Sequence, residues 1–178
     1  MDIIYKRAET DQELHQILDL QSKNIPVSIS EEDKQKEGFL TVKHSFVLLK
    51  TMNDTTAHTI AICDNKVVGY ALSMHKDFKN EIDVLKPMFS NIEKSIPNTL
   101  QYIVMGQICI DKAFRKKGIF RGLYCEMKAH MLPSYQAIIT EVDKTNSRSL
   151  NAHLAIGFTT LYSYQSKNQD WEILKWDL

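Results

Sequence analysis

The sequence lacks any excess of charge, and this absence excludes the simplest sign of a nucleic-acid or membrane-surface partner. Its 178 residues carry 22 basic and 22 acidic side chains, so the formal net charge at pH 7 is +0. Proteins that bind polyanions through their overall field are strongly basic. We therefore expect neither nucleic acid nor a membrane as a partner, and any anion site has to be local.

Long apolar runs are absent as well. No segment approaches the ~20 consecutive apolar residues that span a bilayer. The first residues, Met-Asp-Ile-Ile-Tyr-Lys, lack the basic start and apolar stretch of a secretory signal. These features predict a cytoplasmic protein. A chain of 178 residues is long enough for one substantial core, so we expect a single domain over residues 1–178.

Cysteine is scarce. The chain has three cysteines, Cys63, Cys109 and Cys125, with no Cys-x-x-Cys pair, and each lies in an apolar segment. This pattern favours reduced, buried thiols over disulfides or a zinc site, and we expect no metal. The sequence contains neither G-x-x-x-x-G-K-[ST] nor G-x-G-x-x-G, which excludes a P-loop and a Rossmann dinucleotide fingerprint.

Strand and helix patterns are interspersed along the chain and predict a central sheet with helices on its faces. Thr10 and Glu13 form a capping box at a helix start. The least interrupted apolar run, residues 102–110, is typical of a central strand that is covered on both faces. We expect strands at 3–7, 58–63, 67–74, 102–110, 137–142, 158–164 and 171–176, helices at 11–24, 42–52, 82–92 (interrupted near Pro87), 118–132 and 147–156, and a polar connection at 30–38.

One junction between a strand and a helix has the properties of a phosphate site. The strand at 102–110 runs into a turn with three cations, and a helix begins at Gly118; the cations are Arg115, Lys116 and Lys117. A helix N-terminus offers unpaired amides and about half a positive charge, and glycine lets a phosphate approach the backbone. Two interpretations are open: a diphosphate cradle to which Arg121 adds charge, or a solvated basic turn.

Residues 115–120, Arg-Lys-Lys-Gly-Ile-Phe, resemble the acetyl-CoA signature [Q/R]-x-x-G-x-[G/A] of the GNAT superfamily of N-acetyltransferases. The resemblance implies that the backbone of this turn binds the pyrophosphate of acetyl-CoA. Phe120 departs from the signature, since a small residue is expected there. We therefore expect its side chain to point into the interface between helix and sheet, with Gly122 supplying close approach in its place.

A second segment, residues 146–158, resembles the later N-x-x-[A/S]-x-x-x-Y-x-x-x-G-F pattern of the same superfamily; Asn146, Ser149, Gly157 and Phe158 are in register. In the family the asparagine contacts the pantetheine arm, and the tyrosine is thought to return a proton to the departing thiolate. This chain has His153 at the tyrosine position. Either His153 is the general acid in its charged form, or it packs on the helix and water protonates the thiolate.

An amine acceptor sets a further requirement. An alkylamine with a pKa of about 10.4 is neutral in roughly one molecule in 2,500 at pH 7, which is equivalent to ~4.6 kcal/mol. A general base lowers this obstacle. Glu141, at the end of a predicted strand, is the first candidate for the catalytic base, and Gln107 is a candidate for positioning water. The alternative for Glu141 is a structural hydrogen-bonding role.

The resemblance implies a GNAT-like α/β fold whose mixed sheet splays between its fourth and fifth strands, with helices on both faces. Acetyl-CoA is expected in that opening as co-substrate, and the chemistry implied is direct attack by a primary amine of a small molecule or peptide. A non-catalytic acyl-CoA-binding or regulatory module is the alternative. The sequence leaves the acceptor and the oligomeric state open, a homodimer among the alternatives. The residues expected to bind acetyl-CoA are Ile108, Cys109, Ile110, Arg115, Lys116, Lys117, Gly118, Ile119, Phe120, Arg121, Gly122, Asn146 and Ser149.

Overall fold

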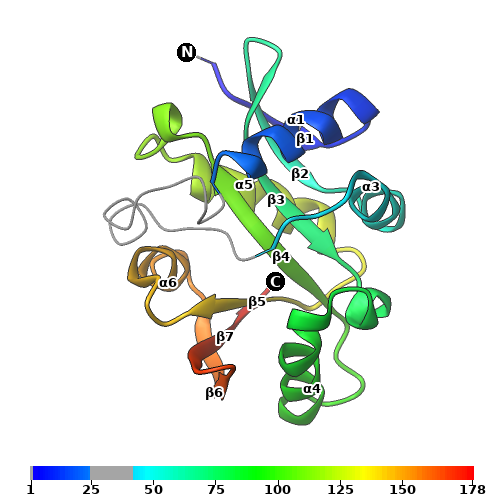
Figure 1. Cartoon of the computed structure of the whole chain (residues 1–178), viewed down its shortest axis with the longest axis vertical. Coiled ribbons are helices and arrows are strands. Elements are labelled where there is room, and N and C mark those ends of the chain that lie inside the picture. The colour runs from blue at the N-terminus through cyan, green and yellow to red at the C-terminus, as the bar shows by residue number, and fades with distance from the viewer. Residues whose placement is uncertain (1, 25–41) are drawn as a thin grey trace.

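A mixed sheet forms the centre of the computed structural model, which describes residues 2–24 and 42–178. Within these residues the sheet has seven strands in the order β1-β2-β3-β4-β5-β7-β6 (Figure 1). The predicted central strand, β4, has three strands on either side of it. The strands are β1 (Ile4–Arg7), β2 (Thr59–Cys63), β3 (Lys66–Met74), β4 (Tyr102–Ile110), β5 (Ala137–Asp143), β6 (Thr159–Ser166) and β7 (Gln169–Asp177).

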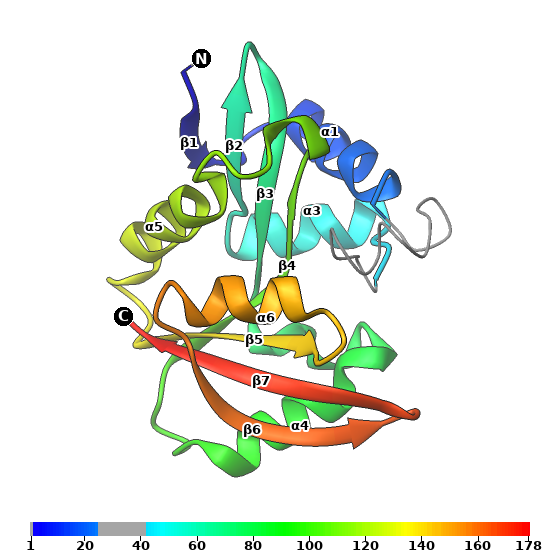
Figure 2. The same ribbon diagram turned by 90° about the vertical axis from the view of Figure 1, so that its left-hand side faces the viewer.

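Helices cover both faces of the sheet, as the α/β prediction requires. On one face α1 and α3 pack their apolar side chains against Tyr70 and Leu72 of β3. On the other face α5 packs Leu123 and Met127 against Ala71, and α6 lies beside β5 (Figure 2). The helices are α1 (Asp11–Ser22), α3 (Phe46–Thr55), α4 (Lys86–Ser95), α5 (Ile119–Met131) and α6 (Ser147–Leu154), with short 3-10 turns at Lys76–Asn80, Asp83–Leu85 and Lys112–Phe114.

Local signals explain where several elements begin. The capping box at α1 is confirmed: the Glu13 amide donates to Thr10 Oγ1 at 3.2 Å, and the Thr10 amide donates to Glu13 Oε2 at 3.0 Å. Pro87 does not interrupt a helix as predicted. It lies in the first turn of α4, where a missing N–H costs nothing because that group has no partner within the helix. The polar connection expected at 30–38 lies outside the described residues.

The sheet opens between β4 and β5. These parallel strands pair only over residues 102–104 and 137–139, and just beyond that ladder Thr140 Oγ1 donates to the Met105 carbonyl at 2.9 Å. Each strand keeps its outer neighbour to the end, because β4 pairs with β3 up to Ile110 and β5 pairs with β7 up to Asp143. Figure 2 shows β5 and β7 running across the direction of β3 and β4. The predicted splay is therefore confirmed.

A β-bulge in β4 lies beside this opening. Leu72 and Ser73 are adjacent in β3, but they pair with Gln107 and Met105, so Gly106 is an extra residue in β4. A bulge bends its strand and turns the local backbone groups out of the regular ladder. The divergence of β4 from β5 thus begins at residues whose backbone is already irregular.

The cysteines only partly follow the prediction. Cys63 and Cys109 are buried, but Cys125 is exposed, so the prediction for Cys125 is wrong. Its neighbours Leu123, Tyr124 and Met127 form the buried side of α5, and Cys125 lies on the opposite side of the helix. An apolar sequence segment does not bury every residue of an amphipathic helix.

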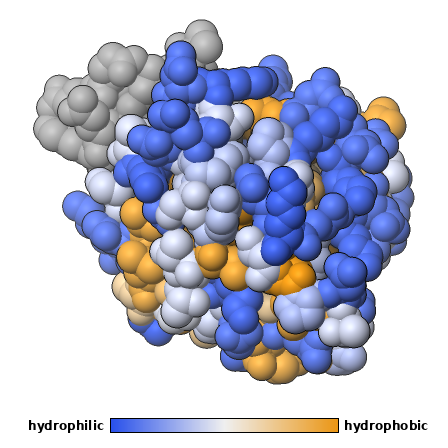
Figure 3. All heavy atoms as spheres, turned by 90° about the horizontal axis from the view of Figure 1, so that it is seen from below, coloured by the Kyte–Doolittle hydropathy of each residue, from blue (hydrophilic) through white to orange (hydrophobic). Residues whose placement is uncertain are grey.

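Within the described ranges, no helix is long and apolar enough to cross a membrane, and no group of histidine, cysteine and carboxylate side chains is arranged to hold a metal ion. On the face shown in Figure 3, hydrophobic side chains lie in small groups among hydrophilic ones. Isolated exposed apolar residues are normal for monomers, so this face gives no test of the homodimer alternative. The exposed large apolar side chains of the described residues come from separate elements: Ile4, Val47, Leu132, Leu154 and Tyr162.

Candidate functional site

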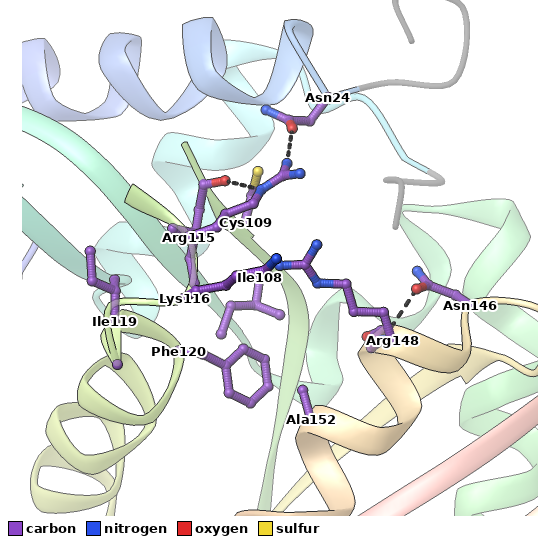
Figure 4. Close-up of a pocket in the computed structure, with 13 residues that line it drawn as sticks. Asn24, Ile108, Cys109, Arg115, Lys116, Ile119, Phe120, Asn146, Arg148 and Ala152 are labelled. Atoms are coloured by element: carbon purple, nitrogen blue, oxygen red, sulfur yellow. Dashed lines mark hydrogen bonds between the residues drawn. The ribbon is translucent and has the colours of Figure 1, made fainter. Parts of the chain in front are cut away.

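Two adjoining cavities lie at the opening of the sheet. The larger, of about 220 Å³, lies where the end of β4 meets the N-termini of α5 and α6 (Figure 4). We call it the outer cavity. Its lining contains most of the residues predicted to bind acetyl-CoA, together with three that were not predicted. The lining residues are Asn24, Ile108, Cys109, Ile110, Arg115, Lys116, Gly118, Ile119, Phe120, Asn146, Arg148, Ser149 and Ala152.

The smaller cavity, of about 70 Å³, lies in the splay itself, and we call it the inner cavity. It is lined by residues 105–108 of β4 and 140–143 of β5, with Asn146, Ser149, His153 and Trp171. Ile108, Asn146 and Ser149 belong to both linings. A molecule that follows β4 inward from the outer cavity therefore reaches the inner one.

The N-terminus of α5 presents its backbone to the outer cavity. Gly118 is the N-cap of α5 and has a left-handed conformation with φ +78°, and a Cβ built on it would have open space within 4 Å. Lys116 also has a positive φ of 61°. The amides of a first helical turn have no partner within the helix, and no side chain at Gly118 covers them. The turn thus has the geometry of an anion cradle.

The cations of this turn have different positions. Arg115 and Lys116 line the outer cavity. Arg115 also braces the turn, because its guanidinium donates to the Ile110 carbonyl at 3.1 Å and to Asn24 Oδ1 at 2.7 Å. Lys117 and Arg121 are not among the lining residues. Lys117 Nζ lies 5.1 Å from the centre of the Phe114 ring, and Arg121 donates to the Ala155 carbonyl at 3.5 Å.

Arg148 is a lining residue that the motifs did not single out. It belongs to the first turn of α6, and Figure 4 shows its side chain extending over the outer cavity toward Lys116. The sequence could have indicated this residue, since Arg148 is a cation that lies between Asn146 and Ser149 in the second motif. Asn146 caps α6 by accepting from the Ser149 amide at 3.2 Å. The second motif therefore supplies a cation as well as a helix cap.

Two predictions about the α5 turn need correction. Phe120 packs against the core cluster between α5 and the sheet, as expected, but it also lines the outer cavity, which was not expected of its side chain. Its side chain extends toward Ala152 of α6 (Figure 4) and packs edge-on against the His153 ring, with 5.0 Å between ring centres. Gly122 gives no access to a phosphate. A Cβ there would collide with the Tyr5 ring of β1, so packing of α5 on the sheet explains this glycine.

His153 is buried with both ring nitrogens hydrogen bonded. Its relative exposure is 0%, and Nδ1 lies 2.7 Å from the Ser149 carbonyl, which can only accept. Nε2 lies 2.7 Å from the Tyr124 hydroxyl and therefore accepts its proton. Burial lowers the pKa of His153 to about 4, against a smaller raising effect of the Ser149 carbonyl. The geometry favours packing over general acid catalysis for His153.

Glu141 lies in the lining of the inner cavity and is half-buried. The Tyr164 hydroxyl of β6 donates to its Oε1 atom. Burial raises the pKa of Glu141 to about 7, although the hydrogen bond from Tyr164 acts in the opposite direction. A carboxylate with this pKa is suited to accept a proton near neutral pH. The arrangement fits the predicted base.

The prediction that Gln107 positions water is wrong for its side chain. Gln107 Oε1 accepts from Tyr70 Oη and from Gln21 Nε2, both at 2.7 Å, and its Nε2 donates to the Val42 carbonyl at 2.8 Å. Gln21 also approaches His44 Nδ1 at 2.9 Å. These bonds join α1 to β3 and β4 in the interior. The Gln107 side-chain amide thus has a structural role, because its oxygen and its nitrogen both bond protein groups.

No protein-family model matches the chain, and a comparison with curated proteins found no match. Solved structures do match. A chain of the NatC complex bound to Gag peptide and CoA has a TM-score of 0.69 at 14% identity, covering 100% of this chain and 99% of that chain. The ribosomal-protein-S18-alanine N-acetyltransferase from Escherichia coli has a TM-score of 0.63 at 12% identity, covering 99% and 94%.

An acetyltransferase assigned to the GNAT family from Desulfovibrio desulfuricans has a TM-score of 0.66 at 12% identity, and the match covers 99% of both chains. Each of these matches spans nearly the whole of both proteins, so the similarity concerns the complete arrangement of strands and helices. At such identities it establishes architecture, which agrees with the resemblance carried by the two motifs. The chain has the fold of the GNAT-family acetyltransferases.

Proposed function

We propose that the chain, as one domain over residues 1–178, is an acetyl-CoA-dependent N-acetyltransferase acting on a primary amine. The observation that carries the proposal is the opening of the sheet between β4 and β5. The outer cavity at this opening reaches the N-terminus of α5, and the inner cavity reaches Glu141. Transfer from an anionic thioester to an amine requires an anion cradle at one end and a proton acceptor at the other, and the half-buried carboxylate of Glu141 would be that acceptor.

The residues of the outer cavity fit the diphosphate and the start of the pantetheine arm. The open backbone at Gly118 would take the paired phosphates, with charge supplied by Lys116 and Arg148. The backbone at 108–110 has no pairing with β5 and would bond the amides of the arm, with Asn146 on the opposite wall. Arg115 has the further task of holding the turn in place.

The proposed reaction is direct attack. The neutral amine nitrogen forms a bond to the thioester carbonyl carbon, the carbon–sulfur bond breaks, and the proton of the amine passes to the Glu141 carboxylate. The thiolate leaves with the electron pair and takes a proton from water. A backbone amide of β4 near the bulge would stabilise the oxyanion, because fixed dipoles beside developing charge lower the barrier.

Glu141 is suited to this step by its environment. A carboxyl group with a pKa of about 7 is partly ionised at neutral pH and is a stronger base than an ordinary glutamate. The acidity of the amine nitrogen rises as its bond to carbon forms, so the base takes the proton during attack. His153 is not assigned an acid role, because its one proton bonds the Ser149 carbonyl.

The proposal is tested by calorimetry with acetyl-CoA and by thiol release across a library of primary amines. Saturable binding with turnover of at least one amine supports it. Absence of acetyl-CoA binding would refute it.

The competing function is a non-catalytic acyl-CoA-binding module, which is favoured by Phe120 at the small-residue position and by the bonded state of His153. Acetyl-CoA binding without turnover across peptides, polyamines, amino acids and aminoglycosides would establish it.

A further inference from the structure

The carboxylate of Glu141 is held by a residue from the edge of the sheet. We infer that Tyr164 is a positioning residue for the proposed reaction: its hydroxyl fixes Oε1 of Glu141 and leaves Oε2 to receive the proton of the amine. The inference rests on the proposed function, and it adds a residue that neither sequence motif contains.

The geometry places the two side chains across a strand from each other. Glu141 belongs to β5 and pairs with Ile173 of β7, while Tyr164 belongs to β6 and pairs with Trp171 of β7. The Tyr164 side chain therefore extends across β7, and its hydroxyl donates to Glu141 Oε1. The two residues are 23 positions apart in the sequence, and the sheet alone brings them together.

The Tyr164 ring is held by packing. It lies against an apolar cluster on the α4 side of the sheet that includes Phe89, Ile139 and Ile173. A ring fixed in this way loses little further conformational entropy when its hydroxyl bonds a carboxylate. Burial and the neighbouring Glu141 raise the pKa of Tyr164, so its hydroxyl keeps its proton and remains a donor at neutral pH.

The other ionisable groups around Glu141 are engaged elsewhere. The Asp143 carboxylate accepts from the amide and hydroxyl of Thr145 and from Gln169 Nε2. Glu172 of β7 bonds Ser163 and lies 3.0 Å from Lys144 Nζ.

His153, which reaches the inner cavity from α6, is bonded to Tyr124 and Ser149. Among the described residues, the Tyr164 hydroxyl is the side-chain group that donates to the Glu141 carboxylate.

Removal of the Tyr164 hydroxyl has a consequence that can be measured at Glu141 itself. The hydrogen bond lowers the pKa of Glu141 while burial raises it. In Tyr164→Phe only the effect of burial remains, so the pKa of Glu141 rises and less carboxylate is present at pH 7. Catalysis then requires a higher pH.

The test is a carbon-13 NMR titration of glutamate carboxyl groups in the full chain, with the Glu141 signal assigned by its loss in Glu141→Gln. In Tyr164→Phe we expect the Glu141 midpoint to rise by roughly half to one pH unit. Tyr162→Phe is the matched control, because Tyr162 lies on the same strand but is 45% exposed. An unchanged midpoint in Tyr164→Phe would overturn the inference.

A second measurement covers the case in which Tyr164→Phe does not fold. In the unaltered protein, the Tyr164 Cζ signal must shift with the same midpoint as the Glu141 carboxyl group. A Tyr164 signal that ignores the Glu141 titration contradicts the inference. Neither readout needs an acceptor, so failure of the proposed function, seen as no acetyl-CoA binding, is distinguishable from failure of the positioning role.

With an amine identified from the library, turnover gives the functional measure. We expect Tyr164→Phe to lower kcat at pH 7 and to recover toward the parent rate at higher pH, with unchanged acetyl-CoA affinity. In a Glu141→Gln background the same substitution should have no further effect, because Tyr164 acts through Glu141. Additive losses in the double variant would contradict this.

Discussion

The two ends of the opening, at α5 and at β5, differ in how the sequence builds them. The centre of the α5 end is built from contiguous residues, where a strand, a cationic turn and a helix N-terminus follow one another around Gly118, and α6 adds Arg148. The β5 end is built from residues distant in sequence, since Glu141 and Tyr164 meet only across β7. Binding an anion needs exposed amides and cations, which a local motif supplies. A proton acceptor at neutral pH needs burial, which only the assembled sheet supplies.

A second contrast lies within the inner cavity itself. His153 and Glu141 both contribute to its lining, and burial favours the neutral form of each. The same effect lowers the pKa of His153 to about 4 and raises that of Glu141 to about 7. Burial thus keeps His153 neutral at pH 7 and brings the pKa of Glu141 close to neutral pH.

The largest expected effect is at the β5 end. Glu141→Gln keeps the size of the side chain and its ability to accept from Tyr164 but removes the base. We expect kcat to fall by about 10²–10⁴-fold, while calorimetry shows an unchanged acetyl-CoA affinity. Glu172→Gln is the matched control, since Glu172 bonds Ser163 and Lys144 away from the cavities. Full turnover by Glu141→Gln would leave Glu141 a structural residue.

At the α5 end, Gly118→Glu combines backbone strain with a negative charge at the anion cradle. The position has φ +78°, which costs a non-glycine residue roughly 1–2 kcal/mol. With charge repulsion added, we expect acetyl-CoA affinity to fall by about 100-fold or more by calorimetry. Arg121→Glu is the control, because it also adds negative charge in the first helical turn but outside the cavity lining. Equal affinities for Gly118→Glu and the parent would remove the diphosphate assignment.

His153→Phe tests the contrast between buried His153 and half-buried Glu141. The substitution leaves the Tyr124 hydroxyl without its acceptor, so we expect a loss of roughly 1–3 kcal/mol in unfolding free energy at pH 7 and little change in kcat per folded molecule.

The pH dependence of this loss has a definite sign. The pKa of His153 falls from 6.5 to about 4 on folding. Its neutral, bonded form therefore contributes fully above pH 6.5, and the contribution is lost as pH falls toward 4. Denaturant titrations of both proteins at pH 7.5 and 4.5 should show a smaller difference at the lower pH. A large drop in kcat with unchanged stability would return His153 to the catalytic residues.

The smallest expected effect separates the cations. Arg148 lines the outer cavity, whereas Lys117 lies over Phe114 and outside the lining. We expect Arg148→Ala to weaken acetyl-CoA binding by about tenfold, consistent with one charge-assisted contact to phosphate, and Lys117→Ala to change it by less than about twofold. Calorimetry at two salt concentrations measures both. The reverse ranking would show that the turn, rather than α6, supplies the main charge.

Local patterns predicted the elements well because their signals are local. The capping box at Thr10 and the strand at 102–110 depend on hydrogen bonds and periodicity within a few residues. Predictions of side-chain direction were less reliable. Gly122 was expected to face a phosphate, but it faces Tyr5 from the distant β1, and periodicity carries no information about which strand lies opposite a helix.

The amino-acid sequence by itself determined the order of strands and helices, the position of the cationic turn and the glycine at the start of α5, because each depends on neighbours along the chain. Only the tertiary structure decided the protonation of the candidate site residues. The pKa values of Glu141 and His153 depend on how deeply each group is buried and on Tyr164 and Tyr124, which reach them from other elements. Desolvation is a property of the packed interior, so it exists only after distant segments have come together.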